Sequence, residues 1–181
     1  MALSVGFPPV AGGRARVLVL GSLPGRRSLE AREYYAQPQN TFWRIMGQLF
    51  GAEPSLPYEQ RLERLRAGRV ALWDVLAAGE REGSLDSSIV SATVVVNDFA
   101  SFFADHSDID LVCFNGRTAA DLYRRRVVPL LGPEQAALPT RLLPSTSPAH
   151  ASLRFEQKLA RWAAALRGQP YDEARAPGRA R

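Results

Sequence analysis

The chain has 181 residues, of which 46% are hydrophobic, so it can form one domain with a sizeable core and is too short to favour two. Its net charge of +5 is compatible with a polyanionic partner such as nucleic acid, although many basic proteins bind none. No apolar run approaches the roughly 20 residues that span a bilayer, and the N-terminus lacks the charged-then-apolar layout of a secretory signal. We therefore expect a monomeric protein of the cytoplasm.

The residues that bind metals and form disulfides are scarce. Cys113 is the only cysteine, and His106 and His150 are the only histidines, which leaves too few soft ligands for a zinc or iron–sulfur site. No close acidic cluster suggests a magnesium site. We therefore expect neither a metal nor another cofactor.

Strand-like and helix-like segments alternate along the chain. Short apolar runs predict buried parallel strands at 16–20, 70–73, 109–114 and 141–143. Helices are predicted at 40–50, 57–67, 97–104, 116–126 and 152–166. Asp98 lies near the start of the helix at 97–104, and Ser152 is the predicted cap of the last helix. This alternation is typical of a three-layer α/β/α sandwich around a mainly parallel sheet of about four strands.

The two ends of the chain lack this periodicity. Residues 1–14 and the Pro-, Gly- and Arg-rich residues 169–181 are predicted to be flexible, the second as a basic tail. The domain itself is expected to cover residues 15–168.

The loops that follow the predicted strands are the places to look for a site, because ligands of open α/β sheets bind beyond the carboxyl ends of the strands. The loop at 21–25 has neither the Gly-x-Gly-x-x-Gly spacing of dinucleotide binders nor the Lys-Ser/Thr ending of a P-loop, which argues against a nucleotide triphosphatase. Taken alone, it fits a tight strand exit equally well.

The segment 33–46 places paired tyrosines and Asn40 ahead of an aromatic helix. Taken alone, Asn40 fits a helix N-cap, and the apolar helical face fits the core. This segment by itself identifies no function.

Five blocks of sequence occur in order between residues 16 and 166. They are Gly21-Ser22-Leu23-Pro24-Gly25; Tyr34-Tyr35-Ala36-x-Pro38-x-Asn40-x-Phe42-Trp43-x-Ile45-Met46; Leu72-Trp73-Asp74-Val75 with Arg81-Glu82-Gly83-Ser84-Leu85-Asp86; Phe114-Asn115-Gly116; and Leu143-Pro144-Ser145-Thr146-Ser147-Pro148-Ala149. Each block is weak alone, but the ordered set resembles the hypoxanthine-DNA glycosylase branch of the uracil-DNA glycosylase superfamily. The resemblance implies a monofunctional enzyme of base excision repair that flips a deaminated base, preferably hypoxanthine, out of DNA and hydrolyses its N-glycosidic bond, leaving an abasic site.

The resemblance also implies roles for individual residues. Asn40 would orient the attacking water, because related mismatch-specific enzymes use an asparagine at the position of Leu23, and leucine cannot polarise water. Tyr35 would stack on the flipped base, with Tyr34 as the alternative. The strand-end Asp74, if ionised, would accept the N1–H of hypoxanthine and repel the N1 of adenine, but it would also accept the N3–H of uracil. Alternatively, Asp74 fixes the loop at 81–86 or caps a turn.

The rest of the site follows from the same resemblance. The base would also contact Gly21, Ser22, Leu23, Phe114 and Asn115, with backbone amides near Ser22 and Leu23 receiving negative charge. DNA would contact Pro144, Ser145, Thr146, Ser147 and His150.

The sequence departs from the family pattern at three positions. Gln37 stands where histidine is usual, His150 where asparagine is usual, and Leu143 where the superfamily has a transition-state histidine. We therefore expect slower chemistry than in the fastest uracil enzymes, unless His150 compensates.

Two other functions remain open at this point. The same fold could remove uracil or thymine from G mispairs, or the domain could bind nucleic acid without catalysis, as Leu23 and the missing histidine suggest. If it is an enzyme, strand cleavage is not expected, because a Schiff-base lyase needs an activated amine and the only lysine, Lys158, is far in sequence from every block.

Overall fold

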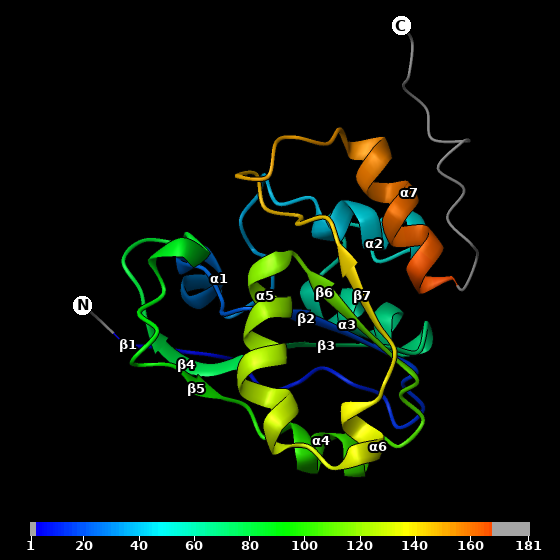
Figure 1. Cartoon of the computed structure of the whole chain (residues 1–181). Coiled ribbons are helices and arrows are strands. Elements are labelled where there is room, and N and C mark those ends of the chain that lie inside the picture. The colour runs from blue at the N-terminus through cyan, green and yellow to red at the C-terminus, as the bar shows by residue number, and fades with distance from the viewer. Residues whose placement is uncertain (1–2, 168–181) are drawn as a thin grey trace, which may run out of the picture.

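Residues 3–167 are described in a computed structural model of the chain, in which a parallel sheet lies at the centre of an α/β domain (Figure 1). The sheet has four strands in the order β3-β2-β6-β7, all parallel. This confirms the predicted α/β class and its parallel sheet. The strands are β2 (Val17–Gly21), β3 (Val70–Asp74), β6 (Leu111–Asn115) and β7 (Thr140–Leu143).

Alternating residues of the strands pack into two cores, one on each face of the sheet. In β2, Val17 and Val19 join one buried cluster, whereas Leu18 and Leu20 join the other. Successive side chains of a strand point to opposite faces, so an entirely apolar strand fits a sheet that is covered on both sides. The apolar run at 16–20 therefore predicts correctly that this strand is buried inside the parallel sheet.

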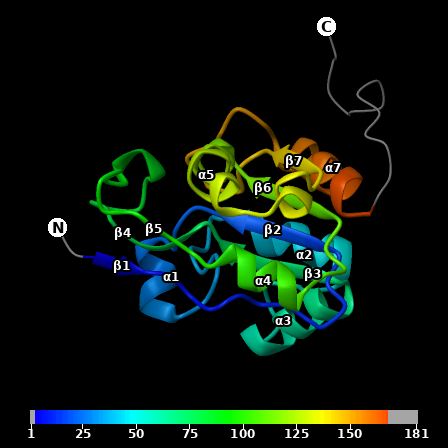
Figure 2. The ribbon, with the colours of Figure 1, turned by 60° about the horizontal axis from the view of Figure 1, so that its bottom comes forward.

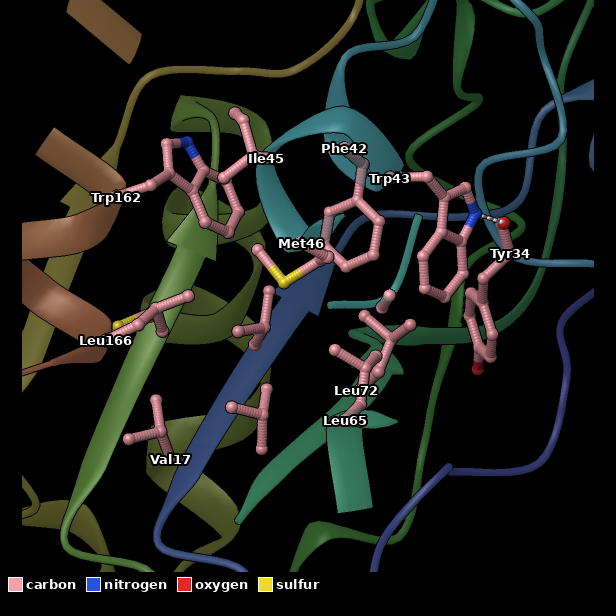
Figure 3. Packing of buried hydrophobic residues seen from close by; sticks show 14 of the residues in the cluster. Val17, Tyr34, Phe42, Trp43, Ile45, Met46, Leu65, Leu72, Trp162 and Leu166 are labelled. Carbon is pink, nitrogen blue, oxygen red and sulfur yellow. Dashed lines mark hydrogen bonds between the residues drawn. The ribbon is translucent and has the colours of Figure 1, made fainter. Parts of the chain in front are cut away.

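Helices cover both faces of this sheet. Those on one face supply the cluster around Val17, and Figure 3 shows Phe42, Met46 and Trp162 lying together in it. The helices on the other face supply the cluster around Leu18. The first group is α2 (Phe42–Phe50), α3 (Tyr58–Ala67) and α7 (Phe155–Leu166), and the second is α4 (Phe99–Asp105) and α5 (Arg117–Leu122), which a π-helical turn at Tyr123–Val127 continues.

A second sheet, of three antiparallel strands in the order β1-β4-β5, is absent from the sequence prediction. It lies together with α1 at one side of the parallel sheet (Figures 1 and 2). Its strands are too short to show a clear alternating pattern, and β5 has only 2 residues. The further elements are β1 (Leu3–Val5), β4 (Leu76–Glu80), β5 (Val95–Val96), α1 (Arg26–Ala31), α6 (Pro133–Ala136) and 3₁₀ turns at Asp86–Ser88 and Val128–Leu130.

The N-terminal residues belong to the domain, which moves the predicted boundary at residue 15. Strand β1 pairs with β4, and Val10 exchanges two backbone hydrogen bonds of 2.8 Å with Leu72. Val10 is also buried. The sequence hides this packing because Pro8 and Pro9 interrupt any period. The predicted basic tail at 169–181 lies outside the described residues.

Two helix starts also differ from the prediction. The last helix begins after Arg154 rather than Ser152, and the Gln157 side chain accepts a hydrogen bond from the Arg154 N–H at 2.9 Å. Helix α2 begins after Thr41 rather than at Asn40. Asp98 does cap α4, since its carboxylate accepts from the Ser101 N–H at 3.1 Å.

Candidate functional site

A cavity of about 470 Å³ lies at the carboxyl ends of the parallel strands, where the loops after β2, β3, β6 and β7 meet. The register places Gly21 beside Asp74 and Asn115 beside Leu143, so the last residues of neighbouring strands are level. The structure brings most of the predicted site residues to this cavity. Those that line it are Gly21, Ser22, Leu23, Tyr35, Asn40, Asp74, Asn115, Ser145, Thr146, Ser147 and His150.

Phe114 and Pro144 are not among the lining residues. The Phe114 ring packs behind the sheet against Tyr123, with ring centroids 5.2 Å apart. The Pro144 carbonyl accepts a hydrogen bond from the Trp162 indole at 3.0 Å. Residues of a strand alternate in direction, so Phe114 points into the core while Asn115 lies at the cavity.

The loop after β2 is held by a segment that sequence reasoning left out of the site. The guanidinium of Arg81, whose side chain is 1% exposed, donates to the carbonyls of Leu23 and Pro24. The Ser22 hydroxyl donates to the Asp86 carboxylate at 2.6 Å. Residues 84–87 thereby form a wall of the cavity. Arg81 and Asp86 lie within one of the five sequence blocks, and this position is the sequence signal that could have assigned them to the site.

Asp74 is buried at the end of β3, and its Oδ2 has no hydrogen bond among the described residues. The pKa of this carboxyl is raised from 3.8 to about 7, mainly by burial and also by the nearby charge of Asp86, while Arg81 opposes both. Asp74 is therefore divided between its neutral and ionised forms near neutral pH, rather than fully ionised as the base-reading argument assumed. Within the described residues, Asp74 interacts with the loop at 81–86 through the charges of Arg81 and Asp86.

Gly21 allows three groups to meet at the floor of the cavity. A Cβ atom there would collide with the Asp74 carboxylate and would lie 2.9 Å from the Tyr35 hydroxyl. The Tyr35 hydroxyl is buried without a hydrogen bond of normal geometry, and burial, followed by the charge of Asp74, raises its pKa. The phenol therefore stays neutral, and both the Tyr35 hydroxyl and the Asp74 Oδ2 are buried at this floor without a hydrogen bond of normal geometry to the described residues.

The two tyrosines have different surroundings. Tyr35 has a left-handed backbone with φ of 55°, and its ring stacks on Phe42 at 4.1 Å between centroids. Such a backbone is strained for a tyrosine and is often found at functional sites. The Tyr34 hydroxyl instead donates to the Pro8 carbonyl at 3.0 Å, and its own carbonyl accepts from Trp43 (Figure 3). Tyr35 is thus the better stacking candidate.

Asn40 binds the start of α2, and its neighbour Thr41 is hydrogen-bonded to the loop after β7. The Asn40 Oδ1 accepts from the Phe42 N–H at 2.9 Å, so its side chain satisfies the first N–H of α2, although the N-cap residue itself is Thr41. The Thr146 carbonyl accepts from the Thr41 N–H at 3.0 Å, and the Asn115 amide bonds to both the N–H and the hydroxyl of Thr146, at 2.9 and 2.8 Å. Asn115 and the buried Thr146 therefore position the two walls of the cavity.

His150 lies at the end of this loop with its Nδ1 buried and without a hydrogen bond in the part of the chain that the structure describes. Its carbonyl accepts from the Lys158 ammonium at 2.7 Å, and burial lowers the pKa of that lysine. Lys158 is thus near the loop in space, although it is far away in sequence. It does not line the cavity.

Among residues 3–167 there is no group of three or more His, Cys, Asp or Glu side chains that could hold a metal ion. No helix in the described part of the chain has the length and apolar character needed to cross a membrane.

Comparisons with known proteins agree on one family. The model of the uracil DNA glycosylase superfamily matches residues 8–167. A protein of Methanosarcina acetivorans named hypoxanthine DNA glycosylase is 38% identical over 90% of this chain and 97% of its own, and one of the same name from Methanosarcina barkeri is 39% identical over 64% of this chain and 73% of its own. The solution NMR structure of a candidate uracil DNA glycosylase from Methanosarcina acetivorans has a TM-score of 0.75 at 36% identity, covering 93% of this chain and 99% of that one.

Proposed function

Because the chain belongs to the uracil DNA glycosylase superfamily, we propose that it removes hypoxanthine from DNA by hydrolysing the N-glycosidic bond. The observation that carries the choice of a deaminated base over adenine is Asp74, whose buried carboxyl has an oxygen without a hydrogen bond to the described residues at the end of β3. Two relatives that are 38% and 39% identical are named hypoxanthine DNA glycosylase, which supports the same substrate.

Base selection would depend on the protonation state of Asp74. The ionised carboxylate accepts the N1–H of hypoxanthine, whereas adenine presents a bare N1 acceptor that repels it. With a pKa of about 7, the neutral carboxyl is also populated near neutral pH, and its O–H could donate to adenine. Binding of hypoxanthine favours the ionised form, so discrimination against adenine improves as the pH rises.

Extrusion of the nucleotide would place the base between Tyr35 and the loop after β2. Tyr35, which lines the cavity and is stacked on Phe42, would supply the aromatic surface for the base, and base–aromatic stacking contributes about 1–3 kcal/mol. The backbone N–H groups of Ser22 and Leu23 would receive the negative charge that develops on the leaving base. Arg81 and Asp86 hold that loop in place.

Asn40 would position the water that attacks C1′. Its Oδ1 carries a second lone pair beyond the one used by the Phe42 N–H, and no described residue accepts from its Nδ2. The same side chain can therefore cap α2 and hold a water. The two sequence-based readings of Asn40 are compatible in this geometry.

We further infer that the enzyme leaves an unbroken abasic strand. A lyase needs an amine that reaches C1′, whereas the Lys158 ammonium is bound to the His150 carbonyl behind the loop and does not line the cavity. Release of the base should therefore precede any strand break, which alkali would then cause.

The test is a panel of duplex oligonucleotides that carry hypoxanthine, uracil, xanthine or a T:G mispair. We expect the purified protein to release hypoxanthine fastest, with strand scission only after alkali. Much faster release of uracil or thymine would identify the chain as a mismatch-type uracil or thymine enzyme, because Asp74 accepts the uracil N3–H equally well. Release from none of the four would contradict the proposed activity.

A further inference from the structure

The Tyr35 hydroxyl and the Asp74 carboxylate meet at Gly21. A Cβ atom on Gly21 would collide with the Asp74 Oδ1 and would lie 2.9 Å from the Tyr35 hydroxyl oxygen. The hydroxyl and the Asp74 Oδ2 are both buried without a hydrogen bond of normal geometry to the described residues. A buried polar group without a partner costs free energy. These two groups are a donor and an acceptor that can satisfy one another.

The segment around Tyr35 is held by hydrogen bonds on both sides. The Tyr34 carbonyl accepts from the Trp43 indole at 2.8 Å (Figure 3), and the Ala36 N–H donates to the Ser28 hydroxyl at 3.2 Å. These bonds fix the two peptide groups that flank Tyr35, whose backbone has a left-handed φ of 55°. The fold therefore fixes the position of the phenol at the floor of the cavity.

The phenol carries its proton over the whole pH range in which Asp74 ionises. Burial, followed by the charge of Asp74, raises the pKa of Tyr35, whereas the pKa of Asp74 is about 7. The Asn115 amide lowers the pKa of the phenol, which is the effect of a donor that faces the phenol oxygen. Asn115 therefore leaves the phenol proton for an acceptor, and the Asp74 carboxylate is an acceptor beside it.

Other charged or titratable groups also act on Asp74. Asp86 and Arg81, from the segment after β4, act on its carboxyl in opposite directions. The Arg81 guanidinium already donates to carbonyls of the loop after β2. Tyr34 is the other phenol affected by the charge of Asp74, but its hydroxyl donates to a backbone carbonyl at 3.0 Å. Of these groups, Tyr35 is the donor left for the carboxylate.

We propose that the Tyr35 hydroxyl donates to the Asp74 carboxylate when this acid ionises, and so positions it to accept the N–H of the extruded base. This inference rests on the proposed function, in which Asp74 reads the edge of the base. One carboxylate oxygen is bound to the phenol, and the other is left for the N1–H of hypoxanthine. Tyr35 then acts through its hydroxyl as well as its ring, because the hydroxyl favours the ionised acid that repels adenine.

The first experiment follows the ionisation of Asp74 by ¹³C NMR in the wild type and in Tyr35→Phe, which keeps the ring and removes only the hydroxyl. Loss of a donor to the ionised carboxylate raises its pKa, so we expect the titration midpoint of Asp74 to move up by about one pH unit. Asp74→Asn identifies the signal. Tyr123→Phe is the matched control, because Tyr123 is a buried tyrosine that does not line the cavity. An unchanged midpoint in Tyr35→Phe would overturn the proposal, whether or not the protein releases a base.

Base release from duplex oligonucleotides that carry hypoxanthine gives the second readout. Because Asp74 ionises with a pKa of about 7 in the wild type, a rise of about one unit makes release by Tyr35→Phe about tenfold slower at pH 6 and nearly equal at pH 9. Lost stacking or a damaged fold would slow release equally at every pH, and such a uniform loss would contradict the role of the hydroxyl. If the midpoint shifts but the wild type releases no base from any lesion, the contact between Tyr35 and Asp74 stands and the proposed hydrolysis fails.

Discussion

Asp74 is a carboxylic acid at a buried position, where ionisation costs free energy. Its burial, without a hydrogen bond to Oδ2 from the described residues, favours the neutral carboxyl and penalises the charged one. Such a group reduces stability when it ionises, so its presence at the floor of a cavity indicates a role in binding. The cost is also measurable, because it depends on pH.

We expect Asp74→Asn to stabilise the protein increasingly as the pH rises. The pKa of Asp74 is raised from 3.8 to about 7, so the folded protein keeps a proton that the unfolded chain has lost across this range. The stability that this proton gives is complete below pH 4 and is lost as the pH approaches 7. The variant lacks this loss, and its advantage should grow by about 2 kcal/mol between pH 5 and pH 8. Urea unfolding at both pH values measures it, and a constant difference would contradict it.

Asn40 combines a structural and a chemical role, and two substitutions separate them. Asn40→Ala should lower base release at least 100-fold and cost about 1 kcal/mol of stability, because the Phe42 N–H loses its acceptor. Asn40→Asp keeps that acceptor and should restore stability, but it lacks the amide donor and should leave release low. Single-turnover rates and urea midpoints give the two readouts. Unchanged release in Asn40→Ala would remove Asn40 from the mechanism.

At the scale of elements, the loop after β2 depends on the buried Arg81. We expect Arg81→Met to cost about 1–3 kcal/mol, because the Leu23 and Pro24 carbonyls lose a buried donor. Base release should fall at least tenfold as the Ser22–Leu23 backbone shifts. Arg126→Met is the control, since Arg126 is exposed and donates to Ser91. Equal effects of the two substitutions would show that Arg81 has no special place in the site.

The elements that could be predicted from sequence are those with a strong period or an uninterrupted apolar run. The four parallel strands are of this kind, and so are α2, α3 and α7. Strands β1 and β5 have only 3 and 2 residues, and β4 mixes one leucine with small residues and a glutamate, so only tertiary pairing specifies them.

The site residues could be predicted from the strand ends and the family-like blocks. The prediction failed where it depended on the direction in which a side chain points. Phe114 and Asn115 are neighbours in sequence but point to opposite faces, which the block pattern alone did not separate. The pKa of Asp74 could not be predicted either, because it depends on burial and on Asp86, which comes from another segment.

At the scale of the whole molecule, N-terminal residues pack against β3 at the edge of the parallel sheet. The Trp73 indole donates to the Phe7 carbonyl at 3.0 Å, and Val10 pairs with Leu72. We expect removal of residues 1–10 to lower the free energy of unfolding by about 3–5 kcal/mol, from lost apolar burial and hydrogen bonds. Urea unfolding tests this, with Leu3→Ala as a control at a 58% exposed position. An unchanged urea midpoint in the truncated chain would show that these residues do not stabilise the domain.

The hydrogen bonds between Thr41 and Thr146 connect the loop after β7 to the segment that carries Asn40. The loop after β7 lies where DNA would be held, and Asn40 lies next to Thr41. A displacement of that loop would therefore be passed to Asn40, for which we propose the water-orienting role, because the Thr146 carbonyl is bound to the Thr41 N–H at 3.0 Å. If these proposed roles hold, DNA binding and hydrolysis are coupled through this backbone contact, and a strand bound in the wrong position would not lose its base.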